Sequence, residues 1–188
     1  MKLYIKNMVC NRCIEAVREV FRQAGVAIKE VTLGEVEVDH DLSSQQQADI
    51  RELLRKRGFD LLEDKNSQVI ERIKNLVIEL IHGNAGPIKV NYSTYLEERI
   101  GRDYSFLSSL FSSVEGVTIE KYIILQRLEK VKELLIYDEQ NLSEIAHRLN
   151  YSSVQHLSNQ FKKATGMSPT AFKKQRLNLR NPLDKVIG

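Results

Sequence analysis

The amino-acid sequence predicts an α+β fold in which a small βαββαβ domain precedes an all-α domain. Segments in which apolar and polar residues alternate, the pattern of half-buried strands, occur only within residues 1–64. From Ser67 onward the apolar residues recur at helical spacing and no segment indicates a strand. The stretch 104–122 also recurs at an offset of 50, as 154–172, so the second domain contains a duplicated unit.

The first domain, residues 1–64, contains six predicted elements. Leu3 and Ile5 alternate with polar residues as in a strand, and Ser43 or Ser44 is suited to cap the second helix. The elements in order are strand KLYIKNM, a helix from Cys13 to Gly25, strands AIKEVTL and EVEVDHD, a helix from Ser44 to Gly58, and strand FDLLE. This order predicts a ferredoxin-like domain, with both helices on one face of an antiparallel sheet.

The second domain, residues 67–180, begins with a helix that Ser67 is suited to cap. Its apolar stripe, residues 69–81, lasts barely two heptads, so a core face is favoured over a dimer seam. Each copy of the duplicated unit predicts a helix, a tight turn and a second helix. The segment TIEKYIILQRLEKVKELLIYD predicts one long helix between the copies. The matching residues are Leu107 and Leu157, Ser108 and Ser158, Phe111 and Phe161, Gly116 and Gly166, and the aromatic residues Tyr122 and Phe172.

Composition and local patterns exclude several classes of protein. The chain has 188 residues, of which 42% are hydrophobic and 28% charged, as in soluble globular proteins. The N-terminus lacks a signal-peptide pattern and the longest apolar stretch, LVIELI, is too short to span a bilayer. We therefore expect a cytoplasmic protein with no membrane partner. No Ser/His/Asp order, P-loop or paired carboxylate cluster stands out, so we do not expect an enzyme.

The distribution of charge indicates a nucleic-acid partner, although the net charge of +3 does not. Between Glu144 and Asp184 the chain has seven lysines and arginines and no acidic residue. A basic stretch of this kind is typical of surfaces that neutralise phosphates. The second copy of the duplicated unit lies inside it.

A helix-turn-helix binds DNA by placing its second helix in the major groove while the first crosses the backbone. A connecting helix of roughly 18 residues spans about 27 Å at 1.5 Å per residue. With the widths of the units added, the two recognition helices come near the ~34 Å separation of successive major grooves. Helical hairpins also occur in proteins that never meet DNA. The duplication, the basic stretch and the polar second helix favour double-stranded DNA as partner.

Residues 67–176 resemble the DNA-binding domain of AraC-family transcription regulators, a seven-helix domain with two helix-turn-helix motifs. The resemblance rests on YLEERIGRDYSFLSSLF, RLEKVKELL and LSEIAHRLNYSSVQHLSNQFKKATGMSPTAFKK, closing at Gly166, Pro169 and Phe172. Asn150 stands where that family often has glycine in the turn, and asparagine tolerates the left-handed conformation.

The resemblance implies that the polar face of each recognition helix enters a major groove. The implied contact residues are Ser105, Ser108, Ser109 and Ser112 in the first unit, and Gln155, His156, Ser158 and Asn159 in the second. Gln155 and Asn159 are one turn apart and amides can pair with adenine, so we expect them to read bases. Lys162 and Lys163 are expected to hold phosphates. The recognition helix of the first unit offers only serines at these positions and has no lysine or arginine. We therefore expect the second unit to supply more of the affinity for DNA.

The two cysteines of the chain, Cys10 and Cys13, lie in the segment NMVCNRC, just before a predicted helix. In a reducing cytosol such a pair more often binds metal or does redox chemistry than forms a structural disulfide. We expect the helix N-terminus and Arg12 to favour the thiolates, and soft thiolates select Cu(I) and similar ions. Structural zinc needs four ligands, so a two-coordinate ion or one shared between two chains fits better. We expect Met8 to pack in the core.

Residues 1–64 resemble a heavy-metal-associated domain of the type found in copper chaperones and copper pumps. The resemblance rests on NMVCNRC, which fits an M-x-C-x-x-C loop, on the element order, and on RGFD before the last strand. The usual glycine before the methionine is Asn7 here.

These observations lead to the hypothesis of a sequence-specific DNA-binding transcription regulator that responds to Cu(I) or another soft metal ion through Cys10 and Cys13. One alternative is a metal-trafficking or redox-sensing protein. Another is a regulator whose first domain is a metal-free module for dimerisation or partner binding. A second copy of the chain and a metal-donor protein are therefore further candidate partners.

Overall fold

The computed structural model describes residues 1–83, 91–175 and 181–186. The strands are β1 (Lys2–Lys6), β2 (Ile28–Thr32), β3 (Glu35–Val38) and β4 (Asp60–Leu62). The helices are α1 (Asn11–Gln23), α2 (Ser44–Arg55), α3 (Lys65–His82), α4 (Tyr92–Ile100), α5 (Tyr104–Glu115), α6 (Ile119–Tyr137), α7 (Leu142–Arg148), α8 (Val154–Thr165) and α9 (Pro169–Gln175), followed by a short 3-10 turn, Leu183–Lys185. An α+β fold with a small antiparallel sheet followed by helices is therefore confirmed.

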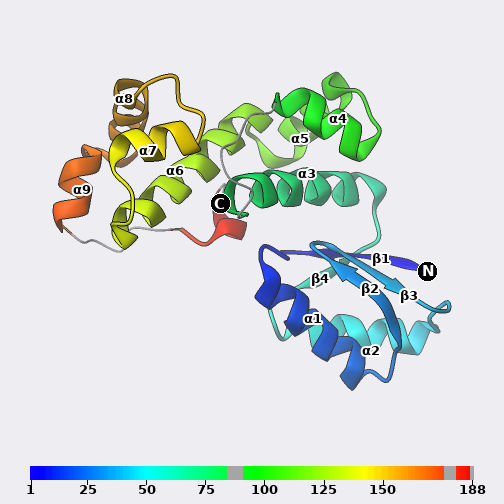
Figure 1. Ribbon diagram of the computed structural model, residues 1–188. Helices are drawn as coiled ribbons and strands as arrows, with labels where there is room; N and C mark the ends of the chain where they lie inside the picture. The colour runs from blue at the N-terminus through cyan, green and yellow to red at the C-terminus, as the bar shows by residue number, and fades with distance from the viewer. Residues whose placement is uncertain (84–90, 176–180, 187–188) are drawn as a thin grey trace.

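The four strands form one antiparallel sheet in the order β2-β3-β1-β4. Leu3 pairs with Val36 across β1 and β3, and both side chains are buried on the face that α1 and α2 cover. Phe21 of α1 and Ile50 of α2 are fully buried in the same core. Helix α3 lies along the opposite face of the sheet (Figure 1).

The helical part has a separate hydrophobic core built around α3 and α6. Helices α4 and α5 lie at one end of α6, and α7, α8 and α9 lie at the other (Figure 1). The duplication is visible in the packing, because each unit buries an aromatic pair. The ring centroids of Phe111 and Tyr122 are 5.5 Å apart, and those of Phe161 and Phe172 are 5.3 Å apart.

Helix α3 starts earlier than predicted, and Ser67 is not its cap. Asp64 is the N-cap, and its side chain accepts a 2.7 Å hydrogen bond from the amide of Ser67. An aspartate three residues ahead satisfies this amide, so Ser67 falls inside the first turn. Only Glu63 and Asp64 separate β4 from α3. The connection between the sheet and the helices is therefore short.

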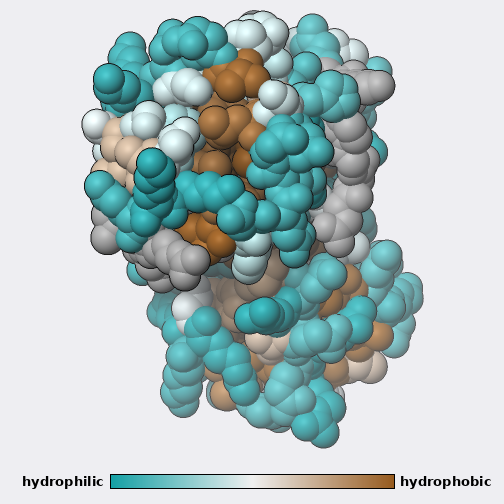
Figure 2. Space-filling view, turned by 60° about the vertical axis from the view of Figure 1, so that its left-hand side comes forward, coloured by the Kyte–Doolittle hydropathy of each residue, from teal (hydrophilic) through white to brown (hydrophobic). Residues whose placement is uncertain are grey.

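The apolar stripe of α3 faces the helical core, as predicted, since Ile70, Ile73, Leu76, Val77 and Ile81 are all buried there. The predicted end of the second domain, at residue 180, lies outside the described residues. Within those residues, no helix is long and apolar enough to cross a membrane. The space-filling view shows a column of hydrophobic residues on the helical half, flanked by hydrophilic ones (Figure 2).

Candidate nucleic-acid interface and thiol site

The two helix-turn-helix units are α4 with α5 and α7 with α8. Helices α5 and α8 have the same length and begin and end at an offset of 50, as the sequence predicted. Gly116 and Gly166 end them in the left-handed conformation, with φ of 70° and 79°. In the turns, Gly101 has φ 72° and Asn150 has φ 54°. The expectation that Asn150 replaces glycine in a left-handed position is confirmed.

The exposed face of α8 presents the polar residues that the sequence singled out. Gln155, His156, Asn159, Lys162 and Lys163 are all exposed. The side-chain nitrogen of Gln155 donates a 3.0 Å hydrogen bond to the side-chain oxygen of Asn159. This bond holds two exposed amide groups side by side. An adjacent donor and acceptor is the arrangement that adenine requires in the major groove.

The first turn of α8 is tied to the rest of the unit. The side chain of Ser153 caps the helix by accepting from the His156 amide at 3.0 Å. The hydroxyl of Ser152 lies 2.9 Å from Nδ1 of His156, whose ring meets the edge of Tyr151. The guanidinium of Arg127, on α6, lies 3.8 Å from the centre of the Tyr151 ring. These contacts fix the N-terminal end of α8, where base-reading side chains of such helices lie.

The serines of α5 divide into two groups. Ser105 and Ser109 are exposed, whereas Ser108 and Ser112 are half-buried. Ser158, at the position equivalent to Ser108, is half-buried as well. Half-buried serines are poor candidates for contacts deep in a groove, so the structure favours the exposed positions.

Sequence reasoning missed two residues of the first unit, Phe106 and Arg102. Phe106 lies on α5 at the position equivalent to His156, and its exposed fraction is 45%. The guanidinium of Arg102, in the preceding turn, lies 5.8 Å from the centre of the Phe106 ring. The first unit therefore has a cation beside its recognition helix, although α5 itself has none. Alignment at the offset of 50 could have found Phe106.

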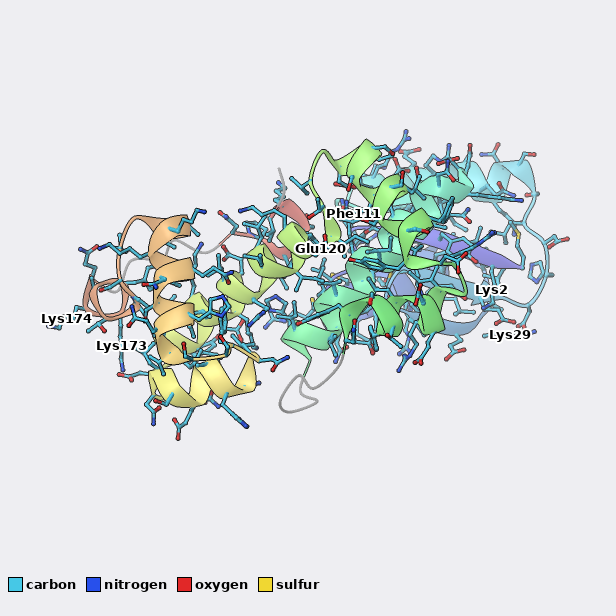
Figure 3. All side chains as sticks on the ribbon, turned by 90° about the horizontal axis from the view of Figure 1, so that it is seen from above. Lys2, Lys29, Phe111, Glu120, Lys173 and Lys174 are labelled. Atoms are coloured by element: carbon cyan, nitrogen blue, oxygen red, sulfur yellow. The ribbon has the colours of Figure 1, made fainter. Side chains whose placement is uncertain are left out.

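Helix α6 sets the separation of the two units. Its 19 residues correspond to a length of roughly 28 Å. Seen from above, α5 and α8 lie toward opposite ends of the helical part (Figure 3). At the inner end of α5 the hydroxyl of Tyr104 donates to the carboxylate of Glu120, which joins α5 to α6.

The end of the molecule that carries α8 is basic. Lys173 and Lys174 of α9 lie at its outer edge (Figure 3). Lys173 forms an ion pair with Asp138, whereas Lys162 and Lys163 on α8 are exposed within the acid-free stretch. On α8 itself, the exposed cations are thus the two lysines that were predicted to hold phosphates.

Cys10 and Cys13 lie at the start of α1, as predicted. Cys10 is the exposed N-cap residue, Cys13 is half-buried, and their sulfurs are 3.6 Å apart. Met8 is fully buried in the core of the sheet domain, which confirms that it packs in the core. Asn7 has φ 71°, so asparagine adopts here the left-handed conformation that glycine favours.

The prediction that both thiols are poised as thiolates is wrong for Cys13. Burial raises the pKa of the Cys13 thiol, and backbone hydrogen bonds only partly oppose this effect. The sequence argument counted the helix N-terminus and Arg12, but it could not see that Cys13 packs against the core. Metal binding at this thiol would therefore release its proton.

The two sulfurs are compatible with one shared ion. Metal–thiolate bonds of about 2.3 Å place two sulfurs at most ~4.6 Å apart, and the observed separation lies within that span. Among the described residues, no group of three or more His, Cys, Asp or Glu side chains is arranged to hold a metal. The donor set thus fits a soft ion with two sulfur ligands better than a closed four-ligand site.

The fold and the exposed faces of α5 and α8 define a double helix-turn-helix domain. Residues 96–175 match the family model described as "Helix-turn-helix domain". The chain is also similar to a probable transcriptional regulator, LumQ, from Photobacterium leiognathi, with 28% identity over 144 residues, 71% of this chain and 52% of LumQ. The HTH-type transcriptional activator RhaR from Pectobacterium carotovorum is 34% identical over 73 residues, 39% of this chain and 26% of RhaR.

A solved structure shares the fold of the helical part. It is the C-terminal domain of AraT, a response regulator from Geobacillus stearothermophilus, with a TM-score of 0.52 and 22% identity. The match covers 63% of this chain and 95% of that domain. Residues 96–175 thus match a helix-turn-helix model, and the helical part shares its fold with the AraT domain. The chain spans about half the length of LumQ and a quarter of that of RhaR.

Proposed function

We propose that this protein is a sequence-specific transcription regulator that binds double-stranded DNA through both helix-turn-helix units of its second domain, residues 67–180. The observation that carries this proposal is the pair of equivalent helices, α5 and α8, set at opposite ends of one connecting helix. Such a pair matches two successive major grooves on one face of DNA. The similarity to transcriptional regulators supports it.

The two units have different tasks in this proposal. Gln155 and Asn159 read bases, and Lys162 and Lys163 neutralise phosphates and set the register. His156 is held beside them and contributes a further polar contact. In the first unit Ser105 and Ser109 make short hydrogen bonds. Ser108, Ser112 and, in the second unit, Ser158 lie on the same helices in half-buried positions, where their contacts with DNA are secondary.

A salt titration of DNA binding tests the proposal. We expect the full chain to bind duplex DNA from the region upstream of its own coding sequence, measured by fluorescence anisotropy. The affinity should fall steeply with salt, with a slope of log K against log salt near −0.9 for each phosphate neutralised. Absence of binding at low salt would contradict a DNA-binding function.

We further propose that residues 1–64 form a ferredoxin-like, heavy-metal-associated domain that responds to Cu(I) or another soft ion. The sheet order, the loop that carries both cysteines and their sulfur separation support this. When bound, the ion would bridge the two sulfurs through one metal–thiolate bond to each, with release of the thiol protons. Binding changes DNA affinity only if the ion prefers one arrangement of the chain over another.

A comparison of the parent with the Cys10→Ser/Cys13→Ser variant tests the metal response. DNA affinity is measured with and without Cu(I), and with an oxidant in a third sample. A response to Cu(I) alone that the variant lacks supports the metal sensor. A response to the oxidant alone supports the redox alternative, and identical behaviour of both proteins points to a metal-free dimerisation or partner-binding module.

A further inference from the structure

Glu71 lies where the sheet domain, α3 and a recognition helix meet. It is on α3, its side chain is only 6% exposed, and it belongs to neither apolar core. The charged groups around it come from three elements, namely Lys6 of β1, Lys74 of α3 and Glu115 of α5. A buried carboxylate is unfavourable unless hydrogen bonds or charges compensate for its lost hydration. A purely structural role for Glu71 would be served better by an apolar residue.

The compensation comes from the loop that carries the cysteines. The backbone amide of Asn7 donates a 2.7 Å hydrogen bond to Oε1 of Glu71. The left-handed conformation of Asn7 aims this amide at α3, and its side chain is held by a 3.0 Å bond to the carbonyl of Gly58. Asn7 precedes Cys10 by three residues, with the buried Met8 between them. A displacement of Cys10 therefore acts on the Asn7 amide across a short, anchored segment.

On its other side Glu71 lies next to an ion pair that reaches the first recognition helix. Lys74, one turn along α3, pairs with Glu115 at 2.6 Å. Both side chains are largely buried, at 15% and 17% exposure, so solvent screens this pair less than a surface pair. Glu115 is the last residue of α5. The charge and position of Glu71 thus bear directly on the group that holds the C-terminal end of α5.

The rest of the contact between α3 and the sheet domain is polar, and some of its hydrogen-bonding groups have no partner. Asn75 lies against Gly34, where an added Cβ would come within 2.1 Å of its side-chain nitrogen. Asn75 is buried, yet neither its amide nitrogen nor its amide oxygen has a hydrogen-bond partner. A polar contact of this type between two parts of a chain shifts more readily than an apolar one.

We propose that Glu71 is a positioning residue that couples the cysteine loop to α5, through the Asn7 amide on one side and the Lys74–Glu115 pair on the other. This inference rests on the proposed DNA-binding function and names how the first domain regulates it. A group bound to the cysteine sulfurs shifts the cysteine loop and changes the strength of the Asn7–Glu71 hydrogen bond. This in turn changes how firmly the Lys74–Glu115 pair holds the C-terminal end of α5. The coupling is reciprocal, so DNA binding changes the reactivity of the cysteines.

The test perturbs the loop without relying on a metal. N-ethylmaleimide attaches one bulky group to each thiol, and the chain has only Cys10 and Cys13 to react. We expect alkylation to change the DNA dissociation constant of the full-length parent by about 5- to 150-fold, the usual range of coupling between sites. The Cys10→Ser/Cys13→Ser variant should not respond to the reagent.

Three variants separate coupling from a structural role. Glu71→Ala should lose the alkylation response. Glu71→Gln keeps an oxygen acceptor for the Asn7 amide but removes the charge beside Lys74, so it should retain part of the response. Lys74→Met interrupts the second step and should also reduce the response, which keeps the test decisive if Glu71→Ala folds poorly. Glu79→Ala, on an exposed position of the same helix, is the matched control and should respond like the parent. The affinity of unmodified protein for DNA is measured alongside.

The outcomes are distinct. An alkylation response in the parent and in Glu71→Gln that disappears in Glu71→Ala supports the coupling. A parent that does not respond, or a Glu71→Ala variant that responds like the parent, overturns it. Parallel titrations with Cu(I) test the metal sensor separately. If Glu71→Ala still responds to Cu(I), the metal-sensor proposal stands and the coupling through Glu71 is rejected. If the parent responds to alkylation but not to Cu(I), the coupling stands and the metal-sensor proposal is rejected.

Discussion

At the scale of single residues, Phe106 is the exposed aromatic side chain on the first recognition helix. It lies beside Arg102 on a helix whose exposed face is otherwise mostly polar, so a DNA groove that covers it would bury apolar surface. The apolar groups that the major groove offers are the methyl groups of thymine. Phe106 therefore fits a contact with thymine in the half-site of the first unit.

We predict that Phe106→Ala lowers affinity for the natural site by about fivefold, corresponding to about 1 kcal/mol of lost apolar burial. Replacing the contacted thymine by uracil, which lacks the methyl group, should weaken the parent similarly and leave Phe106→Ala unchanged. Anisotropy titrations on both DNAs give this comparison. An equal loss for both proteins on uracil DNA would show that Phe106 does not meet the methyl.

Gln155 and Asn159 should differ from the lysines in the kind of loss they cause. Alanine at either amide position should cost about 1–3 kcal/mol and relax preference at particular base pairs. Lys162→Ala should instead weaken binding to every sequence and reduce the salt slope by about 1. Titrations against single-base variants of the site, at several salt concentrations, separate these effects. If Gln155→Ala instead weakened binding to all sequences equally, Gln155 would contact phosphates and would not read bases.

At the scale of elements, the turn between α7 and α8 depends on one asparagine. Asn150 has φ 54°, a conformation that costs an ordinary residue roughly 1–2 kcal/mol. Asn150→Ala should therefore lower the free energy of unfolding by about 1 kcal/mol, while Asn150→Gly should stay within about 0.5 kcal/mol of the parent. Urea unfolding of both variants provides the measurement. Equal stabilities for alanine and glycine would contradict the strain argument.

Helix α3 gives a prediction about pH. Burial raises the pKa of the Glu71 carboxyl, with Lys6 and Lys74 opposing the shift and Glu115 adding to it; Tyr122 of α6 also lies within its field. A carboxyl whose pKa is raised on folding contributes stability that is fully present below its unfolded pKa and is lost as the pH rises through its folded pKa. Glu71→Gln has no such loss.

The melting temperature of Glu71→Gln should therefore rise relative to that of the parent between about pH 4.5 and about pH 7.5. Each kcal/mol of difference corresponds to roughly 2–4 °C for a chain of this size. Thermal scans of both proteins at the two pH values measure it. A difference in melting temperature that does not change with pH would mean that Glu71 keeps its charge on folding without cost.

Elements were the part of the structure that the sequence predicted best. Helices α5, α6 and α8 follow from long apolar periodicity and from the duplication, and burial alternates along β1 and β3 as it should in half-buried strands. The cap of α3 was misplaced because Asp64 and Ser67 are both good capping residues and only the backbone decides between them. The contact of Asn7 with Glu71 and the burial of Cys13 depend on packing between distant segments, which periodicity does not encode.

At the scale of the whole molecule, the proposed DNA binding depends on two units held at a fixed spacing by α6. A protein with one active unit would protect a single short segment of DNA. A protein that uses both must contact the same face of the duplex twice, one helical turn apart. The first domain lies on the far side of α3 from α4 and α5, where it does not block them (Figure 1).

Hydroxyl-radical footprinting of the full chain on DNA from its own upstream region tests this account most directly. We predict two protected windows on one face, with centres about 10 base pairs apart. The window of the second unit should weaken selectively in Gln155→Ala and that of the first in Phe106→Ala. A single window, or no protection under low-salt conditions, would contradict binding by two helix-turn-helix units.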